Sequence, residues 1–338
     1  MCIRDRSHKT GKVALVSAFL VLLFFASAAA SLSCSNGAFD FAGLCDCVFG
    51  SPEESAKLIL LQIRLPRLAA GILSGACLAM AGCCMQSLFR NPLADPSILG
   101  VSSGAALGAV VAMSFFAYPF ALESCALIGG LAAAFAVYKL GSFGGRVSAF
   151  STLLSGIAVN AFCGALVGFF MYSARDVGLR GYVFWSLGSL DRCGWGEIAA
   201  AACAMAAACA VMAICANALN LMALGRQQAF HSGANIRAIW IAAGGAAALA
   251  TSASVAICGI IGFVGLVVPH IIRSAVGPDN RILLPLSAIG GATLLVLADT
   301  AARLWSPADP VPIGVVTAFL GAPFFLALLK RSGESDND

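Results

Sequence analysis

The chain has 338 residues, of which 60% are hydrophobic and 11% are charged, and its formal net charge is +4. A water-soluble domain is usually about a quarter charged, so this composition excludes a soluble globule and makes membrane lipid the expected surroundings and partner. The basic residues form no stripe with interleaved aromatic side chains, so no nucleic acid partner is expected.

The predicted elements are long apolar runs, each able to cross about 30 Å of hydrocarbon as a helix. They lie at 13–33, 68–89, 96–117, 120–140, 150–172, 196–219, 237–257, 259–276, 281–303 and 313–330. The run at 259–276 is the most interrupted, by three glycines and Pro269. Because the runs are continuous rather than alternating, the predicted fold is all-α, a polytopic membrane protein with about ten transmembrane helices.

These runs divide the chain into three parts. Residues 1–12 form a predicted N-terminal cytoplasmic segment, 13–331 a single transmembrane domain, and 332–338 a polar C-terminal tail. Residues 1–6 resemble translated adapter sequence, and we set them aside.

The first apolar run has an alternative interpretation. Lys9 and Lys12 precede it and small residues end it, as in a secretory signal peptide. Its roughly 20 apolar residues are long for a signal core, so we expect a retained first helix.

Basic residues in the loops predict the orientation, because cytoplasmic loops carry more Lys and Arg. If the N-terminus is cytoplasmic, the cytoplasmic side holds Lys9, Lys12, Arg90, Lys139, Arg146, Arg226, Arg237, Arg273, Arg281, Lys330 and Arg331. The outside then holds the smaller set of Lys57, Arg64, Arg67, Arg175, Arg180, Arg192 and Arg303. This bias predicts a multi-pass protein of the inner (plasma) membrane with both termini in the cytoplasm.

The sequence contains 14 cysteines. Most lie in apolar runs or outside any external loop and are expected to act as small apolar side chains: Cys2, Cys77, Cys83, Cys84, Cys163, Cys203, Cys209, Cys215 and Cys258. The others are expected to face the oxidising side, where a disulfide can form and their pairing is open: Cys34, Cys45, Cys47, Cys125 and Cys193. The close pair Cys45 and Cys47 lacks a second pair at ligand spacing, so no metal site is expected.

Signatures of covalent chemistry are absent from the sequence. It has no Gly-x-x-x-x-Gly-Lys-Ser/Thr phosphate loop, no His-Glu-x-x-His metal motif and no Gly-x-Ser-x-Gly nucleophile elbow. We therefore predict no catalytic residue, no cofactor and no enzyme activity, and any ATP hydrolysis must come from a separate subunit.

Glycines recur at every fourth position in three of the runs, a spacing that lets helix backbones approach closely. They are Gly71 and Gly75, then Gly100, Gly104 and Gly108, then Gly164 and Gly168. We expect these positions to pack against neighbouring helices.

Two long and irregular motifs are the most specific parts of the sequence. The first comprises RLPRL at 64–68, GACLAMAG at 75–82 and QSLFRNPLADPSILGVSSG at 86–104. The second comprises GIIGFVGLVVPHIIR at 259–273, DTAAR at 299–303 and PIGVVTAFLGAPFF at 312–325. Together they closely resemble the FecCD-type permease family, which serves iron-siderophore, haem and vitamin B12 uptake, and the resemblance covers about residues 60–331.

The resemblance implies a permease subunit of an ATP-binding cassette (ABC) importer, with residues 13–331 as its single permease domain. The implied partners are two cytoplasmic ABC ATPase subunits, an extracytoplasmic substrate-binding protein and a second permease subunit, in a homodimer or a heterodimer. The implied function is import of an iron chelate of the siderophore type, with haem or cobalamin as alternatives. An ion-coupled secondary transporter is the rival hypothesis, and it is disfavoured because Asp299 is the only acid in the interior of a predicted span.

Three arginines are candidates for binding-protein docking. In the resembled family, arginines at the positions of Arg64, Arg67 and Arg303 receive glutamates of the binding protein. All three lie on the predicted external side, and Arg can hold a carboxylate through two parallel hydrogen bonds. The alternative is that they are helix-end arginines reaching toward the lipid headgroups.

A proline-punctuated turn follows the second run, at residues 91–96. The resembled family uses this turn, with the turn before the fifth span, as its inner gate. The implied gate residues here are Asn91, Leu93, Ser151 and Thr152. The alternative is an ordinary loop whose Asn and Pro serve turn chemistry.

The longest cytoplasmic loop, about residues 219–236, is where the resembled family has a short coupling helix that presses into the ATPase. The implied contact residues are Gly225, Arg226, Gln227, Gln228, Ala229 and Gly233. This chain departs from the family pattern, because Arg226, Gln227 and Gln228 replace the usual acidic residues and Ser232 stands where Leu is usual. The location of the coupling helix is therefore a firmer implication than any individual contact.

Asp299 is an acid within an apolar run, which by default suggests a functional site. It could relay protons, or it could pair with Arg303, one helical turn further on. We favour the pair, because the motif contains both residues.

Overall fold

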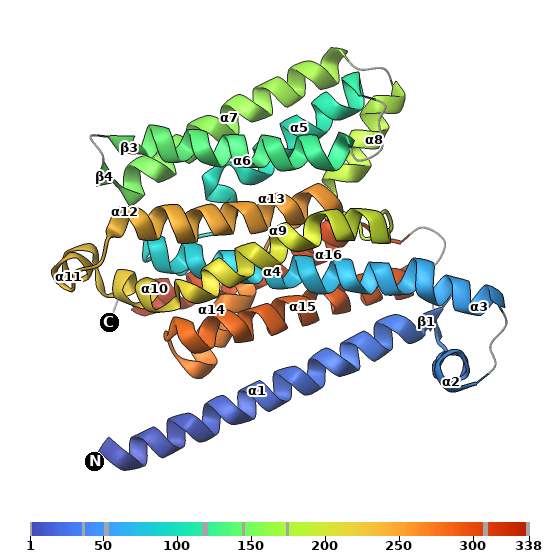
Figure 1. Cartoon of the computed structure of the whole chain (residues 1–338), viewed down its shortest axis with the longest axis horizontal. Coiled ribbons are helices and arrows are strands. Elements are labelled where there is room, and N and C mark those ends of the chain that lie inside the picture. Colours follow the sequence, from blue (N-terminus) through green and yellow to red (C-terminus); the bar gives the residue numbers. More distant parts are fainter. Residues whose placement is uncertain are drawn as a thin grey trace.

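The structure is a computed structural model that describes residues 2–35, 38–50, 54–116, 121–143, 146–173, 176–306 and 310–335. Almost all of the described chain is helical, which confirms the predicted all-α class (Figure 1). The described strands are two-residue ribbons at two turns. β1 (Cys34–Ser35) pairs antiparallel with β2 (Ala38–Phe39), and β3 (Ser142–Phe143) pairs antiparallel with β4 (Arg146–Val147).

The helices divide between two halves of the chain. The first half contains α1 (Cys2–Ser33), α2 (Phe41–Phe49), α3 (Glu54–Ile59), the π-helix η1 (Leu60–Arg64), α4 (Leu65–Phe89), the 3₁₀ helix η2 (Pro96–Leu99), α5 (Val101–Phe115), α6 (Ala121–Gly141), α7 (Ala149–Ser173) and α8 (Asp176–Ser186). The second half contains α9 (Trp195–Ile214), α10 (Ala216–Leu224), α11 (Arg226–His231), α12 (Ile236–Ile239), the π-helix η3 (Trp240–Gly244), α13 (Gly245–Cys258), α14 (Val264–Val276), α15 (Asn280–Trp305) and α16 (Ile313–Ser335).

Each of the ten predicted runs corresponds to a helix. In the part of the chain that the structure describes, seven helical stretches are long and apolar enough to cross a membrane: Gly11–Ser33, Glu54–Phe89, Ala121–Gly141, Ala149–Ser173, Trp195–Ile214, Ile236–Cys258 and Asn280–Trp305. Three shorter apolar helices complete the set: Val101–Phe115, Val264–Val276 and Ile313–Leu326. The prediction of about ten helices is thus confirmed, with two of them, α5 and α14, shorter than their apolar sequence suggested.

Two of the short helices begin several residues after the start of their apolar runs, because the backbone turns there. The run at 96–117 becomes α-helical only after Gly100, whose φ is +75°. The run at 259–276 becomes helical only at Val264, after Gly259 at φ +72° and Phe263 at φ +67°. Left-handed residues cannot continue a right-handed helix, so each apolar run contains a turn that its hydrophobicity conceals.

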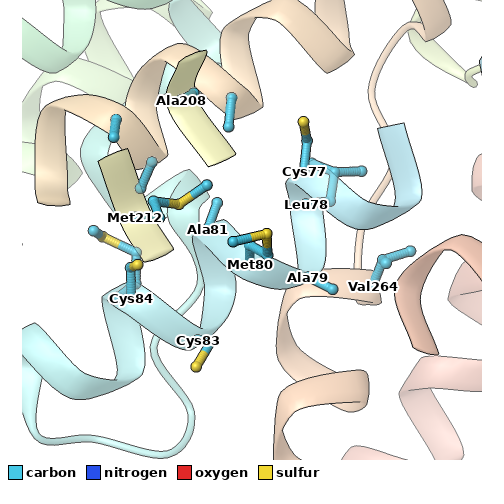
Figure 2. Close-up of a cluster of buried hydrophobic side chains, with 14 of the residues drawn as sticks. Cys77, Leu78, Ala79, Met80, Ala81, Cys83, Cys84, Ala208, Met212 and Val264 are labelled. Carbon is cyan, nitrogen blue, oxygen red and sulfur yellow. The ribbon is translucent and has the colours of Figure 1, made fainter. Parts of the chain in front are cut away.

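Helix α4 lies at the centre of the bundle, with α9, α13, α14 and α15 packed around it (Figure 1). Figure 2 shows its buried side chains extending toward Met212 of α9 and Val264 of α14. Cys77, Cys83 and Cys84 are among them, at 1% exposure or less. These three cysteines therefore act as small apolar side chains, as predicted.

Glycines let α4 touch two of its neighbours backbone to backbone. A Cβ atom added at Gly75 would lie 2.3 Å from the carbonyl oxygen of Gly291 on α15, and one added at Gly82 would lie 1.8 Å from that of Gly265 on α14. A side chain at either position would push the helices apart. Small residues at such crossings are how helices pack closely in lipid, where burial from water provides little attraction between them.

A second group of helices is formed by α5, α6 and α7, and this group packs against α13 through α5 and α6 (Figure 1). A Cβ added at Gly104 or Gly108 of α5 would lie 2.4 Å or 2.0 Å from a carbonyl oxygen of α6, so these two glycines pack as predicted. For Gly164 and Gly168 on α7 the prediction of close packing is wrong within this chain. No described atom lies within 4 Å of a Cβ added at either, because α7 turns this side outward.

The ends of the bundle differ in what they carry (Figure 1). The start of α1, the β3–β4 turn, α11 and the end of α16 lie at one end, which we call the α11 end. Helices α2, α3 and α8 lie at the other, the α8 end. Both termini thus share an end, as an even number of spans requires.

Candidate functional site

At the α8 end, Arg67 joins two acids that are far apart in sequence. Its Nε lies 3.0 Å and 2.9 Å from the two carboxylate oxygens of Asp299, and its Nη2 lies 2.7 Å from Oδ1. Its Nη1 donates to Asp191, which lies between α8 and α9. The guanidinium of Arg67 on α4 is therefore fixed by a buried acid on one side and a half-exposed acid on the other.

The predicted pair of Asp299 and Arg303 is confirmed. Arg303 Nε lies 3.2 Å from Asp299 Oδ2, an ion-pair distance without the alignment of a hydrogen bond. Its Nη2 donates to the hydroxyl of Ser31 at 2.8 Å and to the Ser31 carbonyl at 3.1 Å. What the sequence did not predict is that Arg67 shares the same carboxylate, because i to i+4 spacing says nothing about another helix.

The three predicted docking arginines come together around the end of α1. Arg64 Nη1 donates to the carbonyl of Leu32 at 2.7 Å, one residue beyond the Ser31 that binds Arg303. The side chains of Arg67 and Arg303 are only 11% and 13% exposed, so most of their hydrogen-bonding capacity is used inside the protein. We call Arg64, Arg67, Asp191, Asp299 and Arg303 the arginine cluster.

A polar depression of about 240 Å³ opens beside this cluster. Arg67, Asp191 and Arg192 line it, together with Glu197 at the start of α9. Asp191 is 45% exposed, and Ser189 donates to its second oxygen at 3.2 Å. The depression is where charged groups of the α8 end meet solvent.

At the α11 end, the predicted gate turn follows α4. Arg90 adopts a left-handed conformation, with φ +53°, and ends the helix. The Asn91 side chain accepts a hydrogen bond from the Leu93 backbone N–H at 2.9 Å, which closes the turn, and Asp95 caps η2 in the same way through Ser97. Asn91 thus performs turn chemistry, and it also lies exposed at this end.

The second predicted part of the gate is the start of α7. Thr152 is buried, and its hydroxyl donates to the Ser148 carbonyl at 2.8 Å, while Ser151 is partly exposed. Further along α7, a Cβ added at Gly156 would lie 1.9 Å from the carbonyl oxygen of Ile98, so η2 packs directly on α7. The structure therefore brings the two predicted gate turns to the same end, joined through η2.

The predicted coupling segment forms a short helix, α11, at the far end of the molecule (Figure 1). Gly225 starts it with φ +129°, and Gly233 follows it with φ +81°. Ala229 is fully buried, whereas Arg226, Gln227 and Gln228 are exposed. The helix thus buries Ala229 and places its polar side chains at the surface.

A polar network that the sequence did not predict ties α4 to α10 and α15. The Asn280 side-chain oxygen accepts from the Ser87 hydroxyl at 3.0 Å, and its amide donates to Asn220 at 2.9 Å. Asn220 in turn donates to Asp279 at 2.6 Å. Asn280 is 1% exposed and Asp279 is exposed, so the network runs from the core to the surface.

Gln86 extends the same network to α14. Its side-chain oxygen accepts from Arg273 Nη1 at 2.7 Å, and its amide lies 3.4 Å and 3.3 Å from the carbonyls of Gly265 and Leu266. We call Gln86, Asn220, Arg273, Asp279 and Asn280 the amide network. The signal that could have indicated it is the set of Asn and Gln side chains within apolar helices, because such groups seek partners across helices.

Within the described residues, no group of three or more His, Cys, Asp or Glu side chains is placed to share a metal ion. The described cysteines from Cys34 to Cys258 are free thiols. Cys193, expected at an oxidising surface, is instead buried, with its Sγ 4.0 Å from Cys258 Sγ. Burial keeps the Cys193 thiol off the surface, because the segment before α9 folds back over α13.

Comparison with known proteins decides the class of this architecture. The sequence profile of the FecCD transport family matches residues 19–331. The chain belongs to the FecCD transport family. It is a permease subunit of an ABC importer, a multi-span transport component rather than an enzyme, and a FecCD permease works with ATPase subunits and a second permease.

The chain is similar to individual members of the family over most of its length. It is 43% identical to the hemin transport system permease protein HmuU of Yersinia pestis, covering 84% of this chain and 86% of that one. It is 42% identical to the cobalamin import system permease protein BtuC of Halobacterium salinarum, covering 83% and 76%. A solved structure, an inward-facing conformation of an ABC transporter assigned to the metal-chelate type, is similar with a TM-score of 0.82 and 28% identity, covering 94% and 99%.

Proposed function

We propose that this FecCD permease carries a large metal chelate across the inner membrane, with a tetrapyrrole complex such as haem or cobalamin as first candidate. The observation that carries the proposal is the similarity to a hemin and a cobalamin permease, each above 40% identity over more than four fifths of this chain. Both substrates are bulky tetrapyrrole complexes. An iron-siderophore chelate, expected from the sequence, is the second candidate, favoured by the metal-chelate type of the similar structure.

The second permease subunit is proposed to cover α7 and α16. Helix α7 exposes large apolar side chains along most of its length, among them Phe150, Leu154 and Phe162, and its uncontacted Gly164 and Gly168 leave room for another helix. A cavity of about 620 Å³ opens between α16 and the turn that contains Phe263. Small residues on apolar faces suit close helix packing, and a path between two such subunits would be wide enough for a chelate.

The α8 end is proposed to receive the extracytoplasmic substrate-binding protein at Arg64, Arg67 and Arg303. The geometry supports a division of labour among them. Asp299 holds Arg67 and Arg303 inside the protein, and Arg64 is bound only through a carbonyl, so its charge is not cancelled by any described acid. Acidic side chains of a binding protein are suited to that uncancelled charge and to Arg192 beside it.

The α11 end is proposed to face the cytoplasm and to receive the ATPase at Gly225, Arg226, Gln227, Gln228, Ala229 and Gly233. Two sets of contacts connect helix α11 at this end to the proposed gate at Asn91, Leu93, Ser151 and Thr152. A Cβ added at Gly225 would lie 3.7 Å from Arg90 Nη1, so the coupling helix begins beside the residue that ends α4. The amide network is the second set, through Asn220 of α10.

Transport into proteoliposomes tests the proposed substrate. The permease is reconstituted with its cognate ATPase and binding protein, with ATP inside, and is offered haem, cobalamin or a ferric hydroxamate siderophore. The expected result is ATP-dependent accumulation of a tetrapyrrole and little of the siderophore. A matched control uses an ATPase whose phosphate-loop lysine is replaced.

The outcomes separate the parts of the proposal. Accumulation of the siderophore alone would overturn the tetrapyrrole assignment and leave the importer class intact. Accumulation driven by a proton gradient without the ATPase would contradict the proposed mechanism altogether. The permease alone, in lipid nanodiscs, is expected to hydrolyse no ATP above background.

A further inference from the structure

A cavity of about 390 Å³ lies between α6 and the stretch formed by η3 and α13, near the α11 end. Its walls are apolar and aromatic, with Phe135 and Tyr138 on one side and Trp240 and Ile241 on the other. Phe135 is 61% exposed and Ile241 is 50% exposed, so the cavity opens to the outside of the bundle rather than into its core.

The hollow exists because small residues face each other across it. Gly244, Gly245 and Ala248 line one wall and Ala134 the other. Gly245 has no described atom within 4 Å of an added Cβ, so its missing side chain is open space. The wide π-helical turn of η3 carries Trp240 and Ile241 on the same wall, and such turns often occur at functional sites.

Two cations stand at the mouth of the cavity. Lys139 belongs to the last turn of α6, and Arg237 to the short helix α12. Lys139 Nζ lies 5.5 Å from the centre of the Phe135 ring. Neither cation forms an ion pair with an acid in the part of the chain that the structure describes, and no acid lines the cavity.

We propose that this cavity binds an anionic phospholipid, with one acyl chain against the apolar walls and the phosphate between Lys139 and Arg237. Basic pockets between transmembrane helices attract anionic headgroups, and Trp and Tyr favour the depth at which headgroups meet hydrocarbon. The lipid would hold α6 and α12 together beside the start of α7, where Thr152 lines the same cavity. The site goes beyond the proposed transport function and is independent of which chelate is carried.

A second permease subunit is the competing occupant, and charge argues against it. Two acids whose side chains the structure describes at the α11 end are already engaged: Asp95 accepts from the Ser97 backbone, and Asp279 accepts from Arg281 and Asn220. A second copy of this chain would therefore bring neither of these carboxylates free to meet Lys139 and Arg237. An anionic headgroup supplies the missing charge.

Native mass spectrometry of the complete importer complex tests the proposal. The complex is purified in detergent and supplied with phosphatidylglycerol or phosphatidylcholine of identical acyl chains. The wild type is expected to retain phosphatidylglycerol in preference. In the double variant Lys139→Gln, Arg237→Gln, the ratio of retained phosphatidylglycerol to phosphatidylcholine should fall about fivefold for each cation removed. Retention of phosphatidylcholine should be unchanged.

Two further variants assign the effect to the cavity. Gly245→Phe fills the open space and should reduce retention of both lipids. Lys12→Gln removes an exposed cation at the same end of the molecule, on α1 and away from the cavity, and should change nothing. The charge variants replace exposed side chains, so they remain decisive if Gly245→Phe does not assemble.

Three results would overturn the proposal. Unchanged phosphatidylglycerol preference in the double variant would remove the role of the cations. An equal loss in Lys12→Gln would show a general surface attraction rather than a site. Disulfide cross-linking between two permease subunits through Ile241→Cys would show that a second copy covers the cavity.

Discussion

The arginine cluster and the amide network hold opposite ends of α4 by different chemistry. At the α8 end, Arg67 is fixed by full charges on Asp191 and Asp299. At the α11 end, the buried contacts of Asn280 are with neutral partners, Ser87 and Asn220. Arg67, Asp299 and Asn280 are all buried, but only loss of the Arg67–Asp299 contact leaves a charge without its partner in the interior.

This difference indicates that the contacts at the α8 end are costly to break, whereas those at the α11 end can be rearranged at lower cost. A buried charge without a partner costs about 3–5 kcal/mol, whereas a buried neutral group without one costs about 1–3 kcal/mol. Neutral amides can therefore exchange partners at lower cost. The α11 end, where the proposed coupling helix and the proposed gate turns lie, is the end at which exchange would be useful.

The largest expected effect comes from removing the shared acid of the arginine cluster. Asp299→Ala leaves both Arg67 and Arg303 without their buried partner, and we expect a loss of about 3–5 kcal/mol of unfolding free energy. Asp191→Ala is the matched control, expected to cost about 1 kcal/mol or less because Asp191 is 45% exposed. Unfolding by SDS titration in mixed micelles measures both, and equal losses would break the contrast between buried and exposed acid.

The amide network is expected to be weaker than the arginine cluster. Asn280→Ala removes the partner of Ser87 and Asn220 in the core, for a loss of about 1–3 kcal/mol in the same titration. Asn217→Ala, at an exposed asparagine that binds Arg281, is the control and should stay within about 0.5 kcal/mol of the wild type. A loss in Asn280→Ala as large as in Asp299→Ala would erase the distinction between the two ends.

Docking at the α8 end is best tested at Arg64. Arg67→Glu would place a third acid beside Asp191 and Asp299, which confuses docking with stability. Arg64→Glu reverses the uncancelled charge and should weaken binding of the substrate-binding protein by about fivefold, with a smaller effect at high salt. Surface plasmon resonance on permease in nanodiscs measures it, and an unchanged affinity across the salt series would exclude Arg64 from the docking surface.

The smallest expected effect is a pH dependence at Asp279, which lies just before α15. Hydrogen bonds from the Arg281 backbone and from Asn220 favour its charged form and lower the pKa of Asp279. A lowered pKa adds stability that is present above the unfolded value of about 4 and is lost as the pH falls through the folded pKa. The difference between wild type and Asp279→Asn should therefore shrink by less than about 1 kcal/mol between roughly pH 5 and pH 3, and a difference that grows in acid would reverse the assignment.

The sequence predicted the helices of the bundle and one ion pair. Apolar runs indicated the helices, and the spacing of Asp299 and Arg303 indicated their ion pair. The late starts of α5 and α14 were missed, because backbone turns at Gly100 and Phe263 leave hydrophobicity unchanged.

Contacts between distant segments were beyond the sequence. Nothing in the spacing of Arg67 and Asp299 shows that they form an ion pair, since they lie on different helices 232 residues apart. Gly164 and Gly168 have the same spacing as Gly104 and Gly108 but face away from the other helices of this chain. The spacing indicates how closely two helices can pack, and it does not indicate which face of a helix is covered.

The proposed orientation, with the α11 end in the cytoplasm against the ATPase and the α8 end outside, underlies all of the proposed roles. Gln228→Cys on α11 and Arg180→Cys on α8 place exposed thiols at the two ends. Intact cells are treated with a membrane-impermeant maleimide, the modified peptides are identified by mass spectrometry, and cross-linking to the ATPase is measured in parallel. We expect labelling at position 180 and not at position 228, with cross-linking to the ATPase from position 228 and not from position 180. Labelling of position 228 from outside the cell, or cross-linking of position 180 to the ATPase, would contradict this orientation.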